Sequence, residues 1–180
     1  AEVTLHLSAL LDAPAVLCGT SRLVIDPNRP LDHPESILPE SDGITVPGNR
    51  GIGAEEKARR ARRYFRPYQD AVAALLARVR SREPAPMFLS IHSFVPEMSG
   101  FRRPWQIGLL HAEDVRLADA LRTALVAADP AIVVGDNEPY SGLSDARNTV
   151  RAHAETAGLA NVTIEIRHDL IATRDGARRW

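Results

Sequence analysis

Two patterns of hydrophobic and polar positions alternate along the chain. Short, nearly continuous apolar runs are typical of strands covered on both faces, and segments with apolar residues three and four positions apart are typical of helices. This alternation predicts an α/β fold built in layers around a mostly parallel sheet. The predicted strands are 21–26, 87–92, 105–110, 131–135 and 161–166. The predicted helices are 1–11, 54–82, 113–128 and 146–157.

Single residues predict where some of these helices begin, bend or end. Pro67 should kink the segment 54–82 or start a second helix there, because proline cannot donate a backbone hydrogen bond. Gly158 should end the segment 146–157. The opening helix has no capping residue before it, which indicates a chain that begins inside a domain and lacks one or more N-terminal strands.

Composition and charge exclude several classes of protein. A chain of 180 residues has the size of one domain, and we predict a single domain over 1–180. The formal net charge of −1 provides no field to attract nucleic acid, so the arginine-rich run 59–66 is predicted to be a solvated helix face. The single cysteine, Cys18, excludes an internal disulfide framework and a cysteine-rich zinc site. No apolar stretch is long enough to span a membrane and no signal peptide opens the chain, so we predict a cytoplasmic protein.

Two long irregular stretches, 27–53 and 93–104, directly follow predicted strands. Such stretches are uncommon inside a compact domain and are often functional. In open α/β sheets the ligand crevice lies beyond the carboxyl ends of the strands. Polar residues follow or interrupt four of the predicted strands, and we predict that they converge on one site. They are Asp26, Asn28, Arg29, His92, Ser93, Asp136, Asn137, Glu138, Tyr140 and Glu165.

The strand 87–92 ends on His92, which permits two interpretations. A core histidine would pack against a loop and form a hydrogen bond with a backbone carbonyl group. A functional histidine would use its neutral imidazole as a ligand of a metal ion such as zinc. His111 and His168 also lie near predicted strands and are weaker candidates for this role.

The sequence IDPNRP places Asn28 and Arg29 between two prolines, which restrict the backbone and so orient both side chains. The guanidinium group of Arg29 suits recognition of a substrate carboxylate through two hydrogen bonds, with Asp26 bracing it. The alternative is a turn stabilised by Asp26 or Asn28, with a solvated arginine.

Two later segments add candidate groups to this site. The sequence DNEPYSG has the composition of a turn, and its Asn137 and Tyr140 are also candidates for binding a small ligand. Glu165 interrupts an apolar strand, where a buried carboxylate is costly unless it is paired. In a structural role it would form an ion pair with Arg167. In a functional role, desolvation would raise its pKa and it would act as a general base toward a metal-bound water.

Taken together, these segments resemble the N-formylglutamate amidohydrolase family. The matching stretches are SRLVIDPNRP, SDGITVPGNRG, LSIHSFVP, RPWQIGLL, DNEPYSG and IEIRHDLI, which occur in the family's order and span most of the chain. The resemblance implies a three-layer αβα fold with a mixed, mostly parallel sheet, as in the related zinc carboxypeptidases and aspartoacylase-like deacylases. It also implies a zinc cofactor, with His92 as a metal ligand, Asp26, Asn28 and Arg29 as the element that binds a substrate carboxylate, and Glu165 as the base.

One part of the family's pattern is absent from the sequence. An early histidine and acid would complete the zinc site, and they are expected upstream of Ala1. We therefore keep two hypotheses. The first is a metal-dependent amidohydrolase that cleaves a linear amide of a small acidic compound, such as an N-formylglutamate-like N-acyl amino acid. The second is a non-catalytic domain that retains the pocket and binds a small ligand without the metal. Neither hypothesis involves nucleic acid or a membrane.

Overall fold

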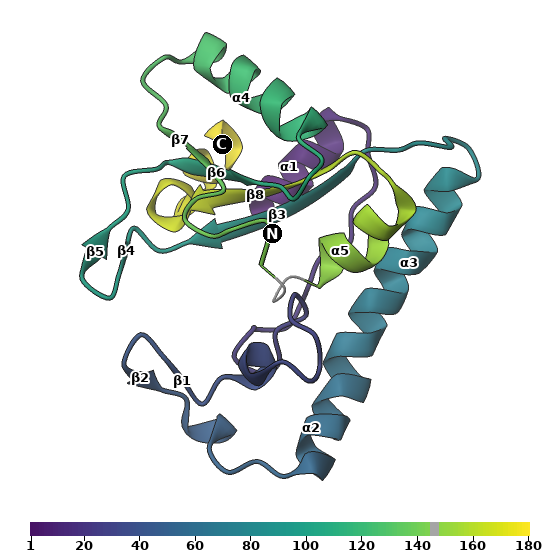
Figure 1. Cartoon of the computed structure of the whole chain (residues 1–180), viewed down its shortest axis with the longest axis vertical. Coiled ribbons are helices and arrows are strands. Elements are labelled where there is room, and N and C mark those ends of the chain that lie inside the picture. Colours follow the sequence, from purple (N-terminus) through teal and green to yellow (C-terminus); the bar gives the residue numbers. More distant parts are fainter. Residues whose placement is uncertain (145–147) are drawn as a thin grey trace.

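A four-stranded sheet forms the centre of the molecule in the computed structural model, which describes residues 1–144 and 148–180 (Figure 1). Its strands are β3 (Phe88–Phe94), β6 (Ile107–Leu110), β7 (Val134–Asp136) and β8 (Asn161–Arg167). They lie in the order β3-β8-β6-β7, with β8 parallel to β3 and antiparallel to β6, and with β6 parallel to β7. Four of the five predicted strands and the mixed, mostly parallel sheet are therefore confirmed.

One face of the sheet is apolar and packs against three helices. Val162, Ile164 and Ile166 of β8 lie on this face together with Ile107 and Leu109 of β6, and all five are buried. The helices that cover them are α1 (Glu2–Leu10), α4 (Arg116–Ala128) and α6 (Arg174–Arg179). This face is the main hydrophobic core of the molecule.

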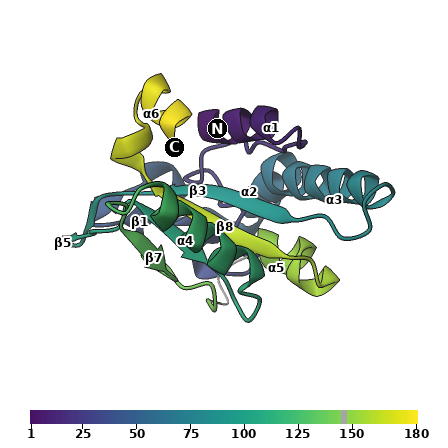
Figure 2. The same cartoon turned by 90° about the horizontal axis from the view of Figure 1, so that it is seen from above.

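The opposite face is covered by a helix only at one end. Helix α5 (Thr149–His153) buries Val150 there and, with Ala154, packs against Phe88 at the start of β3. Figure 2 shows α1 and α6 on one side of the sheet and α5 on the other. The predicted three-layer αβα architecture is thus confirmed, and the polar strand residues lie at the end of the second face that no described helix covers.

The long predicted helix 54–82 is one continuous rod with a wider turn in its middle (Figure 1). Helix α2 (Ala54–Arg60) continues into a π-helical turn (Ala61–Phe65) and then into α3 (Arg66–Arg80). Pro67 lies in the first turn of α3, where a missing N–H group is tolerated. Of the two predicted outcomes, a kink or a second helix, the structure has α3 starting next to this proline after the π-helical turn, within one continuous rod.

The predicted strand 21–26 is wrong. Its residues form turns, and the Asp26 N–H group donates to the carbonyl oxygen of Ser36 instead of pairing with the sheet. The residues of this run are apolar for a different reason. Ile25 is buried in a separate cluster with Ile37 and with Phe65 of the π turn. A helix surface covers this segment, and no sheet is needed to bury it.

The remaining boundaries are partly confirmed. Of the predicted helix 146–157, residues 146 and 147 lie outside the described residues, α5 begins at Thr149, and a 3₁₀ turn (Glu155–Ala157) leads to Gly158 in the left-handed conformation, as predicted. The two irregular stretches contain only short elements. These are the 3₁₀ turns Pro34–Ile37 and Pro47–Asn49 and the hairpins β1 (Glu40–Ser41) with β2 (Ile44–Thr45) and β4 (Glu97–Met98) with β5 (Phe101–Arg102).

The arginine-rich run 59–66 is only partly the solvated face that its charge pattern predicts. Arg59 is exposed and pairs with Glu56 on the same helix. The Arg60 side chain is mostly buried, and its guanidinium group donates to the Val24 and Gly48 carbonyl oxygens, which fixes the loops of 21–53 to α2. No helix of the described residues is long and apolar enough to cross a membrane.

Candidate active site

Four residues in register form a row across the part of the sheet that no helix of the described residues covers. His92 of β3 is the partner of Glu165 on β8, Glu165 is the partner of Gly108 on β6, and Gly108 is the partner of Gly135 on β7. Residues in register on neighbouring strands point to the same face. The predicted metal ligand and the predicted base therefore lie side by side, and the other two strands offer no side chain at this level.

The two glycines let a loop lie directly on the sheet. A Cβ atom at Gly108 would collide with the carbonyl oxygen of Glu138, and one at Gly135 would press on the Glu138 side chain. At Gly142, where the loop leaves the sheet, a Cβ atom would collide with the backbone of His111. A glycine inside a strand often marks such a close backbone approach. The segment 136–142 is thereby held over the face that carries Glu165.

Glu165 is a buried carboxyl group, and one of its oxygen atoms has no hydrogen-bonding partner among the described residues. Only 6% of the residue is exposed, and its Oε2 atom has no hydrogen bond within the described part of the chain. Burial raises the pKa of Glu165 to about 7, against the opposing charges of Arg22, Arg103 and Arg29. The ion pair with Arg167 considered above is not formed, because Arg167 pairs with Asp169 at 2.9 Å.

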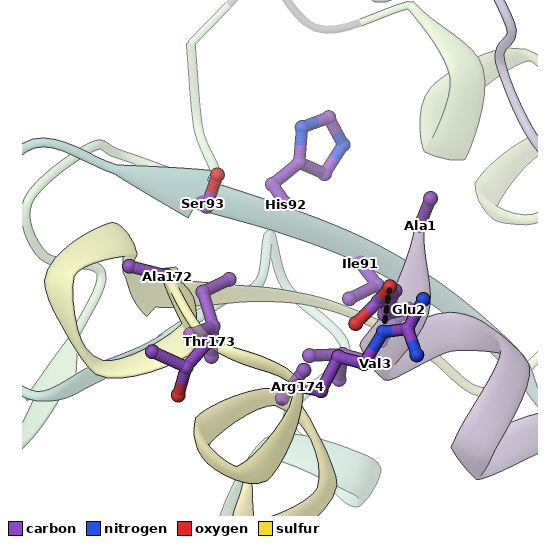
Figure 3. A pocket seen from close by; sticks show the side chains of 11 residues that line it. Ala1, Glu2, Val3, Ile91, His92, Ser93, Ala172, Thr173 and Arg174 are labelled. Atoms are coloured by element: carbon purple, nitrogen blue, oxygen red, sulfur yellow. Dashed lines mark ion pairs between the residues drawn. The ribbon is translucent and has the colours of Figure 1, made fainter.

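His92 is half-buried, and burial lowers the pKa of its imidazole, which favours the neutral form. Its Nε2 atom lies 3.0 Å from the hydroxyl oxygen of Ser90, two residues back on the same face. A cavity of about 420 Å³ lies between α1, β3 and α6, but the imidazole points to the other side of β3 from Ile91 and Arg174, which line that cavity (Figure 3). The His92 ring therefore faces the polar side of the sheet.

The segment that contains Asp26 and Arg29 lies close to this row. Asp26 is buried and accepts hydrogen bonds from Arg22 at 2.6 Å and from the Asn28 N–H group at 2.9 Å. The charges of Asp26, Arg22 and Arg29 all act on the pKa of His92, and those of the same three residues act on Glu165. The structure thus brings Asp26 and Arg29 near the two strand residues. Arg29 also forms an ion pair with Glu35 at 3.1 Å.

Two of the predicted substrate-binding residues use their amide groups to hold the backbone. The Asn28 amide oxygen accepts from the Thr149 N–H group at 3.1 Å, at the start of α5. The Asn137 amide oxygen accepts from the N–H groups of His111 at 3.0 Å and Gly142 at 2.8 Å. Both side chains therefore shape the site, and their contact with a substrate stays a prediction.

The other histidines have identifiable partners or lie at the surface. His111 contacts Asp136 at 2.8 Å and the Ala112 carbonyl oxygen at 2.9 Å, whereas His168 is exposed. His153 contacts the Gln69 amide oxygen at 2.7 Å and links α5 to α3. In residues 1–144 and 148–180, no group of three or more His, Cys, Asp or Glu side chains is arranged to hold a metal ion.

Comparison with known proteins decides the family. The model of the N-formylglutamate amidohydrolase family matches residues 2–172. The chain belongs to this family. The resemblance found in the sequence is thereby confirmed, and the family comprises hydrolases that act on an amide.

Two solved structures are similar to this family member. Gene product Atu2144 from Agrobacterium tumefaciens is 34% identical, with a TM-score of 0.88 over 98% of this chain and 69% of that chain. N-formylglutamate amidohydrolase from Ralstonia eutropha JMP134 is 24% identical, with a TM-score of 0.59 over 83% of this chain and 62% of that chain. The second similarity confirms the fold, and this chain spans less than two thirds of that protein. No curated protein matches the chain.

The family's predicted zinc can be tested against the donors in this chain. His92 fits one ligand position, because burial lowers the pKa of its imidazole and favours the neutral form, and its Nδ1 atom makes no hydrogen bond with any described residue. A catalytic zinc normally has three protein ligands, and the described residues contribute no such set. On their own they do not form a zinc site, and zinc stays a prediction.

Sequence reasoning assigned no role to Arg103, which lies beside this site. Its guanidinium carbon is 4.9 Å from the centre of the Tyr140 ring, and its charge acts on the pKa of Glu165. Arg103 begins the matching stretch RPWQIGLL, but it lies in a loop without periodicity, so the pattern did not indicate what its side chain contacts. Gly108 and Gly135 were also missed, although a glycine within an apolar strand is a signal that could have been used.

Proposed function

We propose that this chain carries the substrate-binding and proton-transfer groups of a metal-dependent amidohydrolase that cleaves an N-formylglutamate-like N-acyl amino acid. The observation that supports this proposal best is Glu165, a buried carboxyl group with a pKa raised to about 7, in register with His92. Such a group exchanges a proton readily near neutral pH, which is what a general base requires.

The reaction is the hydrolysis of a linear amide. Ionised Glu165 accepts a proton from the water that attacks the acyl carbon, and the C–N bond then breaks to give a carboxylic acid and a free amine. The proton held by Glu165 passes to the leaving nitrogen, so the carboxylate is regenerated. Arg29 binds a substrate carboxylate and orients the amide toward Glu165, with Asp26 and Asn28 fixing the loop that carries it.

His92 is the residue through which this chain would contribute to a metal site. Zinc, when bound, supplies Lewis-acid polarisation and lowers the pKa of a bound water. His92 would provide one nitrogen ligand, held by its contact with Ser90. Tyr140 and Asn137 belong to the loop over Glu165, where Asn137 fixes the backbone and Tyr140 lies within reach of a bound ligand.

The test uses purified full-length protein with N-formyl-L-glutamate as substrate and quantifies released glutamate together with bound metal. We expect turnover by the wild type, and we expect His92→Ala to lower bound zinc and turnover together. His6→Ala, at an exposed histidine of α1, is the matched control and should change neither. Absence of hydrolysis in metal-loaded wild-type protein would reject the proposal. Tight binding of N-formyl-L-glutamate without hydrolysis would instead support the ligand-binding domain.

A further inference from the structure

Arg103 lies on the same face of the sheet as His92 and Glu165. Phe94 follows His92 by two positions on β3, so both side chains point to one face. The guanidinium carbon of Arg103 lies 5.8 Å from the centre of the Phe94 ring. The Arg103 N–H group donates to the Pro96 carbonyl oxygen at 2.8 Å, which fixes the backbone just after β3. Contacts of its backbone and of its side chain thus hold Arg103 beside this row, near the end of β3.

Tyr140 holds the other side of this guanidinium group. Its ring centre is 4.9 Å from the guanidinium carbon, and its phenol oxygen accepts a hydrogen bond from Arg103 at 3.1 Å. Tyr140 belongs to the segment 136–142 that lies against Gly108, the register partner of Glu165. Arg103 is therefore enclosed between the end of β3 and the loop that covers Glu165.

Arg103 is buried and forms no ion pair with any described residue. Only 7% of the residue is exposed, and its other hydrogen bonds go to the Val95 carbonyl oxygen and the Met98 sulfur, which are neutral. No carboxylate in the described residues pairs with it. A buried charge is costly unless it is paired, so a site of this kind favours an incoming anion. Because the Tyr140 oxygen accepts from Arg103, its own O–H group can donate to the same anion.

We propose that Arg103 and Tyr140 bind a second carboxylate of the substrate, so that the enzyme selects N-acyl amino acids with an acidic side chain. Arg29 binds one carboxylate, and the Arg103–Tyr140 pair binds the other. Because both carboxylates of the substrate are then held in place, the amide between them is also oriented. This inference rests on the proposed function for the acyl amino acid, but the anion-binding pair can be tested without catalysis.

The first test measures binding of two small probes to the full-length protein by calorimetry. Glutarate has two carboxylates, and its monoamide has the same shape with one of them neutral. We expect the wild type to bind glutarate about 100-fold more tightly, the value of a charge-assisted contact, and Arg103→Gln to reduce this ratio to near one. Arg102→Gln, at the exposed neighbouring arginine, should keep the ratio. Equal binding of both probes by the wild type would overturn the proposal, and so would an unchanged ratio in Arg103→Gln.

The second test measures kcat/KM for N-formylglutamate and for N-formylglutamine. Loss of folded protein lowers both values equally, so their ratio reports selectivity even if a variant is unstable. Tyr140→Phe retains the ring over Arg103 and removes only the hydroxyl group, and it should lower the ratio about fivefold. A ratio unchanged in both Tyr140→Phe and Arg103→Gln would overturn the proposal. If the wild type hydrolyses neither substrate but still prefers glutarate, the proposed function fails and the anion-binding pair stands.

Discussion

Alternate residues of β8 form its two faces. The faces differ in whether contacts with other residues compensate for the loss of water around the buried side chains. Val162, Ile164 and Ile166 are apolar and pack against helices, so their burial stabilises the fold. On the other face Thr163 and Glu165 are also buried, yet the Oε2 atom of Glu165 has no hydrogen bond within the described residues to compensate for its desolvation. The comparison shows that one strand carries compensated apolar burial on one face and an incompletely compensated buried carboxyl group on the other.

Replacing Glu165 should give the largest effect, a loss of turnover without a loss of stability. Glu165→Gln retains the shape of the side chain and removes the base, so we expect kcat for N-formylglutamate to fall by roughly 10²- to 10⁴-fold. Stability at pH 8, measured by urea unfolding, should not decrease, because a neutral amide is easier to bury than a carboxylate. Glu97→Gln, at an exposed glutamate of β4, is the control and should leave kcat unchanged. Normal turnover in Glu165→Gln would remove this residue from the mechanism.

Replacing a residue on the apolar face should show the reverse. Ile166 is 1% exposed, and Ile166→Ala should lower the free energy of unfolding by about 2–5 kcal/mol through lost burial and the cavity left behind. Turnover per folded molecule should stay unchanged. Ile44→Ala removes the same atoms from a residue that is 72% exposed in β2 and should cost almost nothing. A fall in kcat of folded Ile166→Ala would show that the two faces are not independent.

The same contrast explains which parts of the fold the sequence could predict. The run 161–166 pairs with a strand on each side and is buried on both faces of the sheet. Its apolar pattern is therefore enough to identify a strand. The run 21–26 has a similar pattern, but Ile25 is buried against a helix and a turn. An apolar run shows that a segment is covered, but it does not show which element covers it.

The candidate site was predictable only where the strands themselves set its geometry. His92 and Glu165 lie on neighbouring parallel strands, so their polar character within apolar runs was enough to predict that they meet. Asn28 and Asn137 were assigned to a substrate, although an amide group serves a loop backbone equally well, and here both do so. Arg103 depends on how a loop folds back over Phe94, which no local pattern encodes.

A pH dependence of stability should sharpen the comparison further, because only the polar face of β8 titrates. The pKa of Glu165 is raised from 4.5 to about 7 by burial, so the unfolded chain loses its proton first as the pH increases. The free energy of unfolding of metal-free protein should therefore fall by up to about 3 kcal/mol between about pH 4.5 and pH 7, and the loss should be complete above pH 7. The measurement compares urea unfolding of wild type and Glu165→Gln across this range, and the difference between them should follow this curve. A constant difference would mean that Glu165 has an ordinary pKa.

Arg29 should give the smallest effect, because it approaches the row from the segment 27–53 and is not part of β8. Arg29→Lys keeps the positive charge but loses the planar group that binds a carboxylate through two hydrogen bonds. We expect KM for N-formylglutamate to rise roughly tenfold with a smaller change in kcat, because the carboxylate is bound in both the ground state and the transition state. Steady-state kinetics at saturating substrate separates the two quantities.

The Arg29 variant needs its own control, because Arg29 also pairs with Glu35. Glu35→Gln removes that ion pair at a partly exposed position and should change stability by less than about 1 kcal/mol. If Arg29→Lys changes neither KM nor kcat, then its ion pair with Glu35 is structural and the substrate carboxylate binds elsewhere. If kcat falls while KM stays constant, Arg29 acts only in the transition state, and the chemistry is not confined to the strand residues. A rise in KM alone would show that β8 supplies the proton transfer and the loop segment supplies the binding.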